Sequence, residues 1–297
     1  MKKLFFIIAF LFATPAHAEI NVFACEPEWK SLAEKIGGKN ITAISATSYK
    51  QDPHFATARP GLLAAMRKAD LVICSGAGLE VGWLPVLLQK SGSTQTQTGG
   101  KGNLMAADYV LILEKPQTID RSNGDVHPEG NPHIHLNPYN ILKVGNELAK
   151  RFEATDPSNK ALYQQNWNEF ETKWKQKISI WEKQAAPLKN MAVITHHNAW
   201  AYLFDWLKIK QVATLEDKPG IPPSTSHLEE LVNIAKTQRP AVIIRSAYNP
   251  TNASEWLSEK TGVKATELPF TVNEEGKPQD IIALFDQIIN SLGEYAR

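Results

Sequence analysis

Short apolar runs alternate with helical patterns along most of this 297-residue chain, and one long helical segment interrupts the alternation near its middle. Alternating strands and helices are typical of βα units, in which the strands of one sheet run parallel. The interruption divides the alternation into two series. We therefore predict an α/β fold of two βαβ-type lobes with mostly parallel sheets, joined by one long helix.

Both series can be read from the apolar runs and the helical patterns between them. In the first series we expect strands at 20–24, 41–45, 71–76 and 109–113, and helices at 27–36, at 60–68 and from near Leu79. In the second series we expect strands at 191–195, 211–215, 241–245 and 264–268, and helices near 198–207, 224–238, 252–261 and 279–293. The polar, glycine-rich stretch 91–103 is expected to be a surface loop.

The long helical segment has one apolar face. Its large apolar residues recur at the spacing of one side of an α-helix: Tyr163, Trp167, Phe170, Trp174, Ile178 and Trp181. The pattern predicts a helix of about 28 residues and about 42 Å. We expect this stripe to face the core rather than a ligand. The expected boundaries are an N-terminal lobe at 19–155, the connecting helix at 156–187 and a C-terminal lobe at 188–297.

The first eighteen residues have the pattern of a secretory signal peptide. Lys2 and Lys3 precede an uncharged apolar run at 4–13, which is too short to span a bilayer. A small-x-small pattern ends the segment, so we expect cleavage after Ala18. No cysteine follows the run directly, so a lipid anchor is not expected. These features predict a periplasmic protein.

The charge balance argues against some classes of partner. The chain has 32 Lys and Arg against 31 Asp and Glu, a formal net charge of +1, and it has no polybasic tract. Nucleic acid and anionic membrane surfaces are therefore not expected partners. No second long apolar segment follows the signal peptide, and we expect the mature protein to be a soluble monomer.

The two cysteines, Cys25 and Cys74, each lie at the C-terminal end of an expected strand. In an oxidising compartment a cysteine pair favours a disulfide, and a bridge is geometrically feasible if the two strands are neighbours. Two buried free thiols are the alternative, because cysteine is commonly buried. We expect the disulfide, on the strength of the compartment.

Several histidines follow expected strands, where parallel sheets bind their ligands. His54 follows the second strand, His197 follows the first strand of the second lobe, and His133 lies in the loop that closes the first lobe. Three imidazoles from two lobes would then meet in one interlobe cleft. Such a set suits Zn²⁺, with copper, nickel and cobalt still open, whereas Mn²⁺ prefers more oxygen ligands.

The segment GNPHIHLNP at 130–138 holds two histidines, His133 and His135, between two Asn-Pro pairs. Pro132 and Pro138 restrict the backbone here, and a braced loop suits a ligand that must be held before the ion arrives. The segment alone leaves open which histidine binds. The chain has no CxxC, HExxH, GxSxG or P-loop motif, which argues against a thiolate zinc site and several enzyme classes.

With these histidines in place, the chain resembles the solute-binding proteins of bacterial zinc and manganese ABC transporters. The resemblance covers essentially the whole chain after residue 18 and rests on five features in order: Asp52-Pro53-His54 with Arg59-Pro60, ADLVICSGAGLE, Asn131-Pro132-His133 with Leu136-Asn137-Pro138, His197-Asn198-Ala199-Trp200, and the long helix. It implies one metal ion held between two lobes for delivery to a membrane permease. It also implies the ligands His54, His133 and His197, with His135 and His196 as neighbours.

The fourth ligand position departs from the family pattern. The family often has an aspartate before a proline at the exit of the last strand, whereas this chain has Leu268 and Pro269 there. Either water or another side chain is then expected at this position. The candidates, in which Glu216 leads, are Glu216, His127, Glu267 and His227. The stretch Gly124-Asp125-Val126-His127 is either a loop that picks up metal or an ordinary polar loop.

The leading interpretation is a binding protein without chemistry of its own. It would capture Zn²⁺, or less readily Mn²⁺ or another divalent metal, and pass it to a cognate ABC-transporter permease. One alternative is a zinc-dependent hydrolase, because three histidines plus an open position also describe a catalytic zinc. Glu216 would then be the general base. The other alternative is a periplasmic metal chaperone or adhesin without a transporter.

Overall fold

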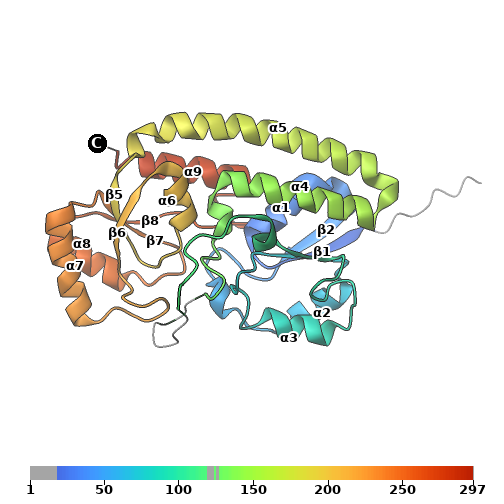
Figure 1. The fold of residues 1–297 in the computed structure, drawn as a ribbon, viewed down its shortest axis with the longest axis horizontal. Helices are drawn as coiled ribbons and strands as arrows, with labels where there is room; N and C mark the ends of the chain where they lie inside the picture. Colours follow the sequence, from blue (N-terminus) through green and yellow to red (C-terminus); the bar gives the residue numbers. More distant parts are fainter. Residues whose placement is uncertain (1–18, 119–123, 125–126, 297) are drawn as a thin grey trace, which may run out of the picture.

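The computed structural model describes residues 19–118, 124 and 127–296, so the predicted signal peptide at 1–18 lies outside the described residues. Two α/β lobes lie side by side along one long helix (Figure 1), and each is built around a four-stranded parallel sheet. The predicted α/β class is confirmed. Within the described part of the chain, no helix has both the length and the apolar character needed to cross a membrane.

The N-terminal lobe has strand order β2-β1-β3-β4, all parallel. Its strands are β1 (Ile20–Ala24), β2 (Ile41–Ser45), β3 (Leu71–Cys74) and β4 (Asn103–Met105). Its helices are α1 (Pro27–Gly37), α2 (Pro60–Lys68), α3 (Leu84–Ser91) and α4 (Pro138–Thr155). Val22 joins the apolar cluster of α1 and α4, while Phe23 joins that of α2 and α3. Because successive strand residues face opposite sides, helices cover both faces of this sheet.

The C-terminal lobe repeats this construction with strand order β6-β5-β7-β8, again all parallel. Its strands are β5 (Ala192–Thr195), β6 (Lys210–Thr214), β7 (Val242–Arg245) and β8 (Ala265–Glu267). Its helices are α6 (Ala201–Leu207), α7 (Thr225–Gln238), α8 (Asn252–Thr261) and α9 (Ile281–Gly293). Val193 packs in the cluster of α6 and α9, and Ile194 in that of α7 and α8.

The connecting helix α5 (Lys160–Ala185) extends over both lobes (Figure 1). All six residues of the predicted apolar stripe are buried, which confirms that the stripe faces the core. Two of its indoles are also hydrogen-bonded. Trp174 Nε1 donates to the carbonyl of Pro138 (2.8 Å), and Trp181 Nε1 donates to Asp286 Oδ1 (2.7 Å) in α9. One helix therefore anchors elements of both lobes.

Helix α4 runs along α5 and was not predicted from the sequence. Gly145 makes the close packing of the two helices feasible, since a Cβ at this position would lie 2.4 Å from Cζ3 of Trp167. Any larger residue would push the helices apart. On the polar side of α4, Arg151 donates hydrogen bonds to Glu147 and to the Tyr109 hydroxyl.

The first residues of the C-terminal helix α9 contact the N-terminal lobe. The backbone N–H of Ile281 donates to Ser31 Oγ (3.0 Å) in α1, and Lys35 of α1 pairs with Asp280 (2.7 Å). Lys30 pairs with Glu274 (2.7 Å) in the preceding segment. The two lobes are thus joined at α5 and again at the contact between α1 and α9.

Two predictions about the first lobe were wrong. The run 109–113 is not the fourth strand, because 103–105 pairs with β3 instead and 106–109 forms a short 3-10 helix. The helix expected near Leu79 begins at Leu84. Gly76, Ala77 and Gly78 all have positive φ, so the backbone turns there before the helix can start.

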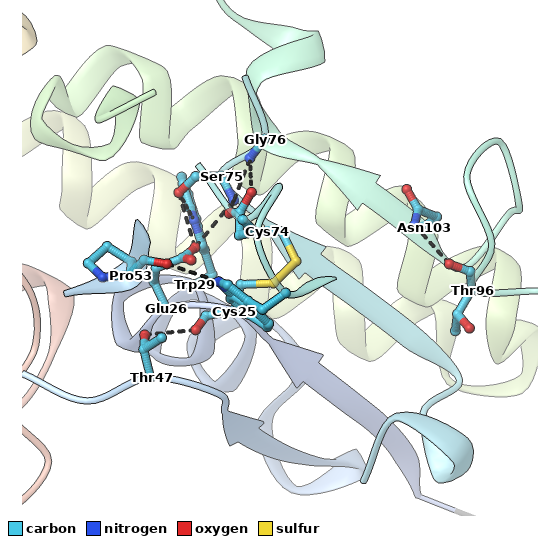
Figure 2. Close-up of a disulfide and its surroundings, with 12 residues drawn as sticks. Cys25, Glu26, Trp29, Thr47, Pro53, Cys74, Ser75, Gly76, Thr96 and Asn103 are labelled. Atoms are coloured by element: carbon cyan, nitrogen blue, oxygen red, sulfur yellow. Dashed lines mark hydrogen bonds between the residues drawn. A yellow bond between two sulfur atoms is a disulfide. The ribbon is translucent and has the colours of Figure 1, made fainter. Parts of the chain in front are cut away.

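The predicted disulfide is present between Cys25 and Cys74 (Figure 2). The two residues follow β1 and end β3, which are hydrogen-bonded neighbours in the sheet, as the sequence required for a bridge. Next to the bridge, Trp29 Nε1 donates to Ser75 Oγ (2.9 Å). The bridge and this bond tie the start of α1 to the exit of β3.

Two buried carboxyl groups lie beside this bridge. Glu26 Oε2 accepts the Ser75 hydroxyl (3.1 Å), and Glu80 Oε1 accepts the Ser75 backbone N–H (2.8 Å). Burial raises the pKa of Glu80 to about 7. Burial, and next the charge of Glu80, raises the pKa of Glu26 well above its usual value. The pair therefore keeps a proton to higher pH than exposed carboxyl groups do.

Candidate metal centre

His54 lies at the exit of β2, in a 3-10 turn at Pro53–Phe55. Asp52 caps this turn: its Oδ1 accepts the backbone N–H of His54 (3.0 Å) and the ring Nδ1–H (2.7 Å). Burial opposes ionisation of Asp52, but the hydrogen bond and charge of His54 hold the carboxyl pKa below its usual value. The ionised carboxylate keeps the proton on Nδ1, which leaves the Nε2 lone pair for a ligand.

His133 lies in the proline-braced segment before α4. Its backbone N–H donates to Asn131 Oδ1 (3.1 Å), and the residue is 1% exposed. Neither ring nitrogen has a hydrogen-bond partner among the described residues. Burial, and then the nearby imidazoles of His54 and His197, lower the pKa of His133 well below its usual value. A neutral, buried imidazole with two unpaired nitrogens is costly unless something binds it.

His197 follows β5 and belongs to the other lobe. Its Nδ1 donates to Glu216 Oε2 (2.7 Å), and Glu216 is held in place because its own N–H bonds to the carbonyl of His196 (3.0 Å). Burial opposes ionisation of Glu216, yet the hydrogen bond from His197 and the charge of that ring lower its pKa. Glu216 therefore orients His197 as Asp52 orients His54. The Nε2 atom of His197 again keeps a lone pair for a ligand.

These three imidazoles converge. One ligand nitrogen from each of His54, His133 and His197 lies within 4.8 Å of the other two. The ring centroids are 5.2, 5.5 and 5.7 Å apart. A tetrahedral ion with Zn–N bonds of about 2.1 Å holds its nitrogens about 3.4 Å apart, so small rotations of the rings would close the site. Among the described residues the other ligand-type cluster is Cys25, Cys74 and Glu80, and its sulfurs are joined in the disulfide.

His127 is a fourth imidazole at this cluster. Its Nε2 lies 3.1 Å from Nε2 of His54, and its ring centroid is 6.4 Å from that of His133. Of the stretch named as a loop candidate, Asp125 and Val126 lie outside the described residues. A cavity of about 280 Å³ opens beside the cluster and is lined by His127, His133 and His197 together with Glu114.

The other candidates are engaged elsewhere. Glu267 bonds to Tyr49 (3.0 Å) and Arg245 (3.0 Å), and His227 Nε2 lies 3.0 Å from the carbonyl of Thr214.

The two neighbouring histidines differ: His135 has its contacts away from the cluster, whereas His196 lies beside Glu216, the partner of His197. His135 is buried, with Nε2 2.9 Å from the carbonyl of Phe270 and Nδ1 3.2 Å from Glu28. His196 lies 3.7 Å from Glu216. The structure therefore brings together His54, His133, His197 and His127, and gives Glu216 a supporting position.

Sequence reasoning missed Asp52 and Glu114. Asp52 could have been found, since an aspartate two residues before a histidine, with a proline between them, forms a cap that also reaches the ring. Glu114 carries no such signal, because its contacts are made with residues far along the chain.

Two α/β lobes, each with a parallel sheet, and a cluster of imidazoles in the seam between them define a metal-binding protein of the solute-binding class. The chain belongs to the family described as zinc-uptake complex component A, periplasmic (ZnuA), which matches residues 22–295.

Relatives and solved structures agree with this membership. The manganese ABC transporter substrate-binding lipoprotein PsaA of Streptococcus pneumoniae is 23% identical over 278 residues, covering 90% of this chain and 85% of that protein. The zinc-binding lipoprotein AdcA of the same species is 23% identical over 285 residues, covering 90% of this chain and 55% of that longer protein. A crystal structure of ZnuA has the same fold, with a TM-score of 0.78 at 20% identity over 93% of this chain and 98% of that one.

Proposed function

We propose that this protein captures one Zn²⁺ ion with His54, His133 and His197 as direct ligands, and that His127 completes the site. The observation that carries the proposal is the His133 ring, which is buried with both nitrogens unpaired and faces two other imidazoles. A cation shared by these rings would satisfy one of the two His133 nitrogens that otherwise lack a partner.

The preference for zinc follows from the donor atoms. A set of imidazole nitrogens suits zinc, whereas manganese favours carboxylate and water oxygens. The two acidic side chains nearest the ligands, Asp52 and Glu216, are occupied by hydrogen bonds to His54 and His197. Relatives are named for manganese as well as for zinc, so the donor set is the argument for zinc here.

We further propose that the protein works as a monomer in the periplasm after cleavage behind Ala18, and that it delivers the ion to an ABC-transporter permease for import. In this proposal it has no enzymatic activity. Glu216 was the candidate general base of a hydrolase, and its bond to His197 supports an orienting role instead. Membership in a zinc-uptake family favours transport over a chaperone or adhesin role.

The test is a metal-dependent change in stability. Binding to the folded state alone adds about 2.7 kcal/mol to the free energy of unfolding when free zinc is a hundred times the Kd. We expect the chelated and dialysed protein to gain melting temperature on addition of Zn²⁺, and to gain less with Mn²⁺ at equal concentration. A melting temperature that neither ion moves would overturn the proposal.

A further inference from the structure

Glu114 joins the segments that carry two of the proposed ligands. Its Oε2 atom accepts Nδ2–H groups of Asn131 (2.9 Å) and Asn198 (2.9 Å). Asn131 also accepts the backbone N–H of His133, and Asn198 directly follows His197. One carboxylate oxygen therefore bridges the ligand-bearing segment of the first lobe and that of the second.

Other hydrogen bonds close a network around this bridge. Asn131 Nδ2 also donates to the carbonyl of Asn198 (2.9 Å), across the seam between the lobes. The Tyr202 hydroxyl, from α6, donates to the carbonyl of Asn131 (2.9 Å) and accepts the N–H of Leu113 (2.9 Å). Gln211 Nε2 donates to Asn198 Oδ1 (2.9 Å), which fixes that amide on β6.

The backbone around Glu114 is held in an unfavourable conformation. Glu114 has φ of 54°, in the left-handed region that residues other than glycine avoid. Gly130 has φ of 109°, and a Cβ there would lie 2.6 Å from the carbonyl of Leu113. The segment 130–131 therefore packs closely on residues 113–114. Strain of this kind persists where the surrounding structure enforces it, and it is concentrated at functional sites.

We propose that Glu114 is a positioning residue that sets the separation of His133 from His197 and thereby slows release of the bound ion. The inference rests on the metal site proposed above. An ion held by ligands from both lobes leaves when those ligands separate, and separation of the two segments breaks at least one of the two bonds to Glu114, together with the direct bond from Asn131 to the carbonyl of Asn198. The expected consequence is a slower dissociation rate with little change in the association rate.

The test compares Glu114→Ala with Glu114→Gln. Glutamine keeps one side-chain oxygen, and in the wild type both asparagines donate to a single oxygen. We expect Glu114→Ala to release Zn²⁺ about ten times faster or more, the range typical of residues that orient metal ligands. Glu114→Gln should change the rate by much less than this factor, because it keeps the accepting oxygen. Glu129→Ala removes another glutamate, which is exposed and directly precedes Gly130, and this variant serves as the matched control.

A second measurement separates positioning from general stability. Glu114→Ala should reduce the gain in melting temperature that zinc produces, whereas a merely structural role would lower the melting temperature equally with and without zinc. Glu114→Ala and Asn198→Ala should also be non-additive in dissociation rate, because they break the same bond.

Several results would overturn the inference. They are unchanged release from Glu114→Ala, an equal defect in Glu114→Gln, an equal loss of stability in both metal states, and additive rates in the double variant. Failure of the wild type itself to bind zinc would instead overturn the proposed function, and this inference with it.

Discussion

His54 and His127 approach each other through their Nε2 atoms, which lie 3.1 Å apart. Because Nδ1 of His54 donates to Asp52, the Nε2 atom of the neutral ring carries a lone pair. His127 then supplies the proton of this contact. A metal ion that replaces the proton would receive a lone pair from each ring, so the contact marks His127 as the fourth ligand we propose.

We expect His127→Ala to weaken zinc binding by about 10–100-fold, on the order of an orienting residue rather than of a buried ligand. His127 lies at the cavity, where water can take the vacant position as it does in open zinc sites. Competition against a chelator of known affinity measures the change. An affinity equal to that of the wild type would mean that water already holds the fourth position.

Alanine at His54, His133 or His197 should each weaken zinc binding by more than the loss of His127, because each removes a direct bond from an enclosed site. The same chelator competition measures all three. His227→Ala is the matched control, since His227 lies away from the cluster beside Thr214. The assignment fails if the His227 variant binds zinc more weakly than any of the three ligand variants.

His135 offers a contrasting case in the same segment. Its ring is buried against Phe270 and Glu28, so His135→Ala should lower the stability of the metal-free protein more than it changes zinc affinity. The opposite pattern would mean that His135, and not His133, is the ligand.

The regular elements could be predicted because their signals are local. The strands at 20–24 and 41–45 were predicted at the bounds that the structure has, and the stripe from Tyr163 to Trp181 is buried as its spacing indicated. Parallel sheets also place their ligand-binding edge at the strand exits, which is why His54 and His197 could be expected near each other.

The features that the sequence did not predict depend on contacts with residues elsewhere in the chain. The run 109–113 is apolar, yet Leu113 bonds to Tyr202 at the interlobe seam, and the place beside β3 is taken by 103–105. The contacts of Glu114 join residues that only the folded seam brings together. No local pattern reports a partner of this kind.

Zinc affinity should fall as the pH falls through the range in which imidazole titrates, around 6.5, because protons compete for the ligand nitrogens. Burial, and then its neighbouring imidazoles, lower the pKa of the His133 ring, so this ring stays neutral to lower pH. Titration calorimetry at several pH values checks this. Equal affinity at pH 5 and pH 7.5 would contradict ligation by imidazoles.

Removal of the disulfide should destabilise the protein without removing the metal site. Cys25 and Cys74 are 49 residues apart in the sequence, and closing a loop of that size is worth up to about 4 kcal/mol through the entropy of the unfolded chain. We expect Cys25→Ser with Cys74→Ser to lose stability of this order in urea while keeping zinc affinity. Free thiols in unreduced protein from its native compartment would contradict the bridge itself.

Glu80→Gln should change how stability depends on pH. The folded-state pKa of Glu80 is about 7 against an ordinary 4.5, because burial disfavours its charged form. A raised pKa means that the protonated carboxyl stabilises the fold, so the contribution is full below pH 4.5 and is lost as the pH rises through 7. Glutamine stays neutral, and its single oxygen can still accept the N–H groups of Ser75 and Gly76, because both lie within hydrogen-bond distance of Glu80 Oε1 (2.8 and 3.3 Å).

The free energy of unfolding of metal-free Glu80→Gln should therefore equal that of the wild type near pH 4.5 and exceed it by up to about 3 kcal/mol near pH 8. Urea unfolding across this range measures the difference, in which the titration of groups that do not interact with Glu80 cancels. The exposed Glu259→Gln is the control and should run parallel to the wild type. If Glu80→Gln also runs parallel to it, or is the less stable protein at pH 8, then the Glu80 carboxylate is ionised in the fold without cost, and its position beside Glu26 does not strain the native state.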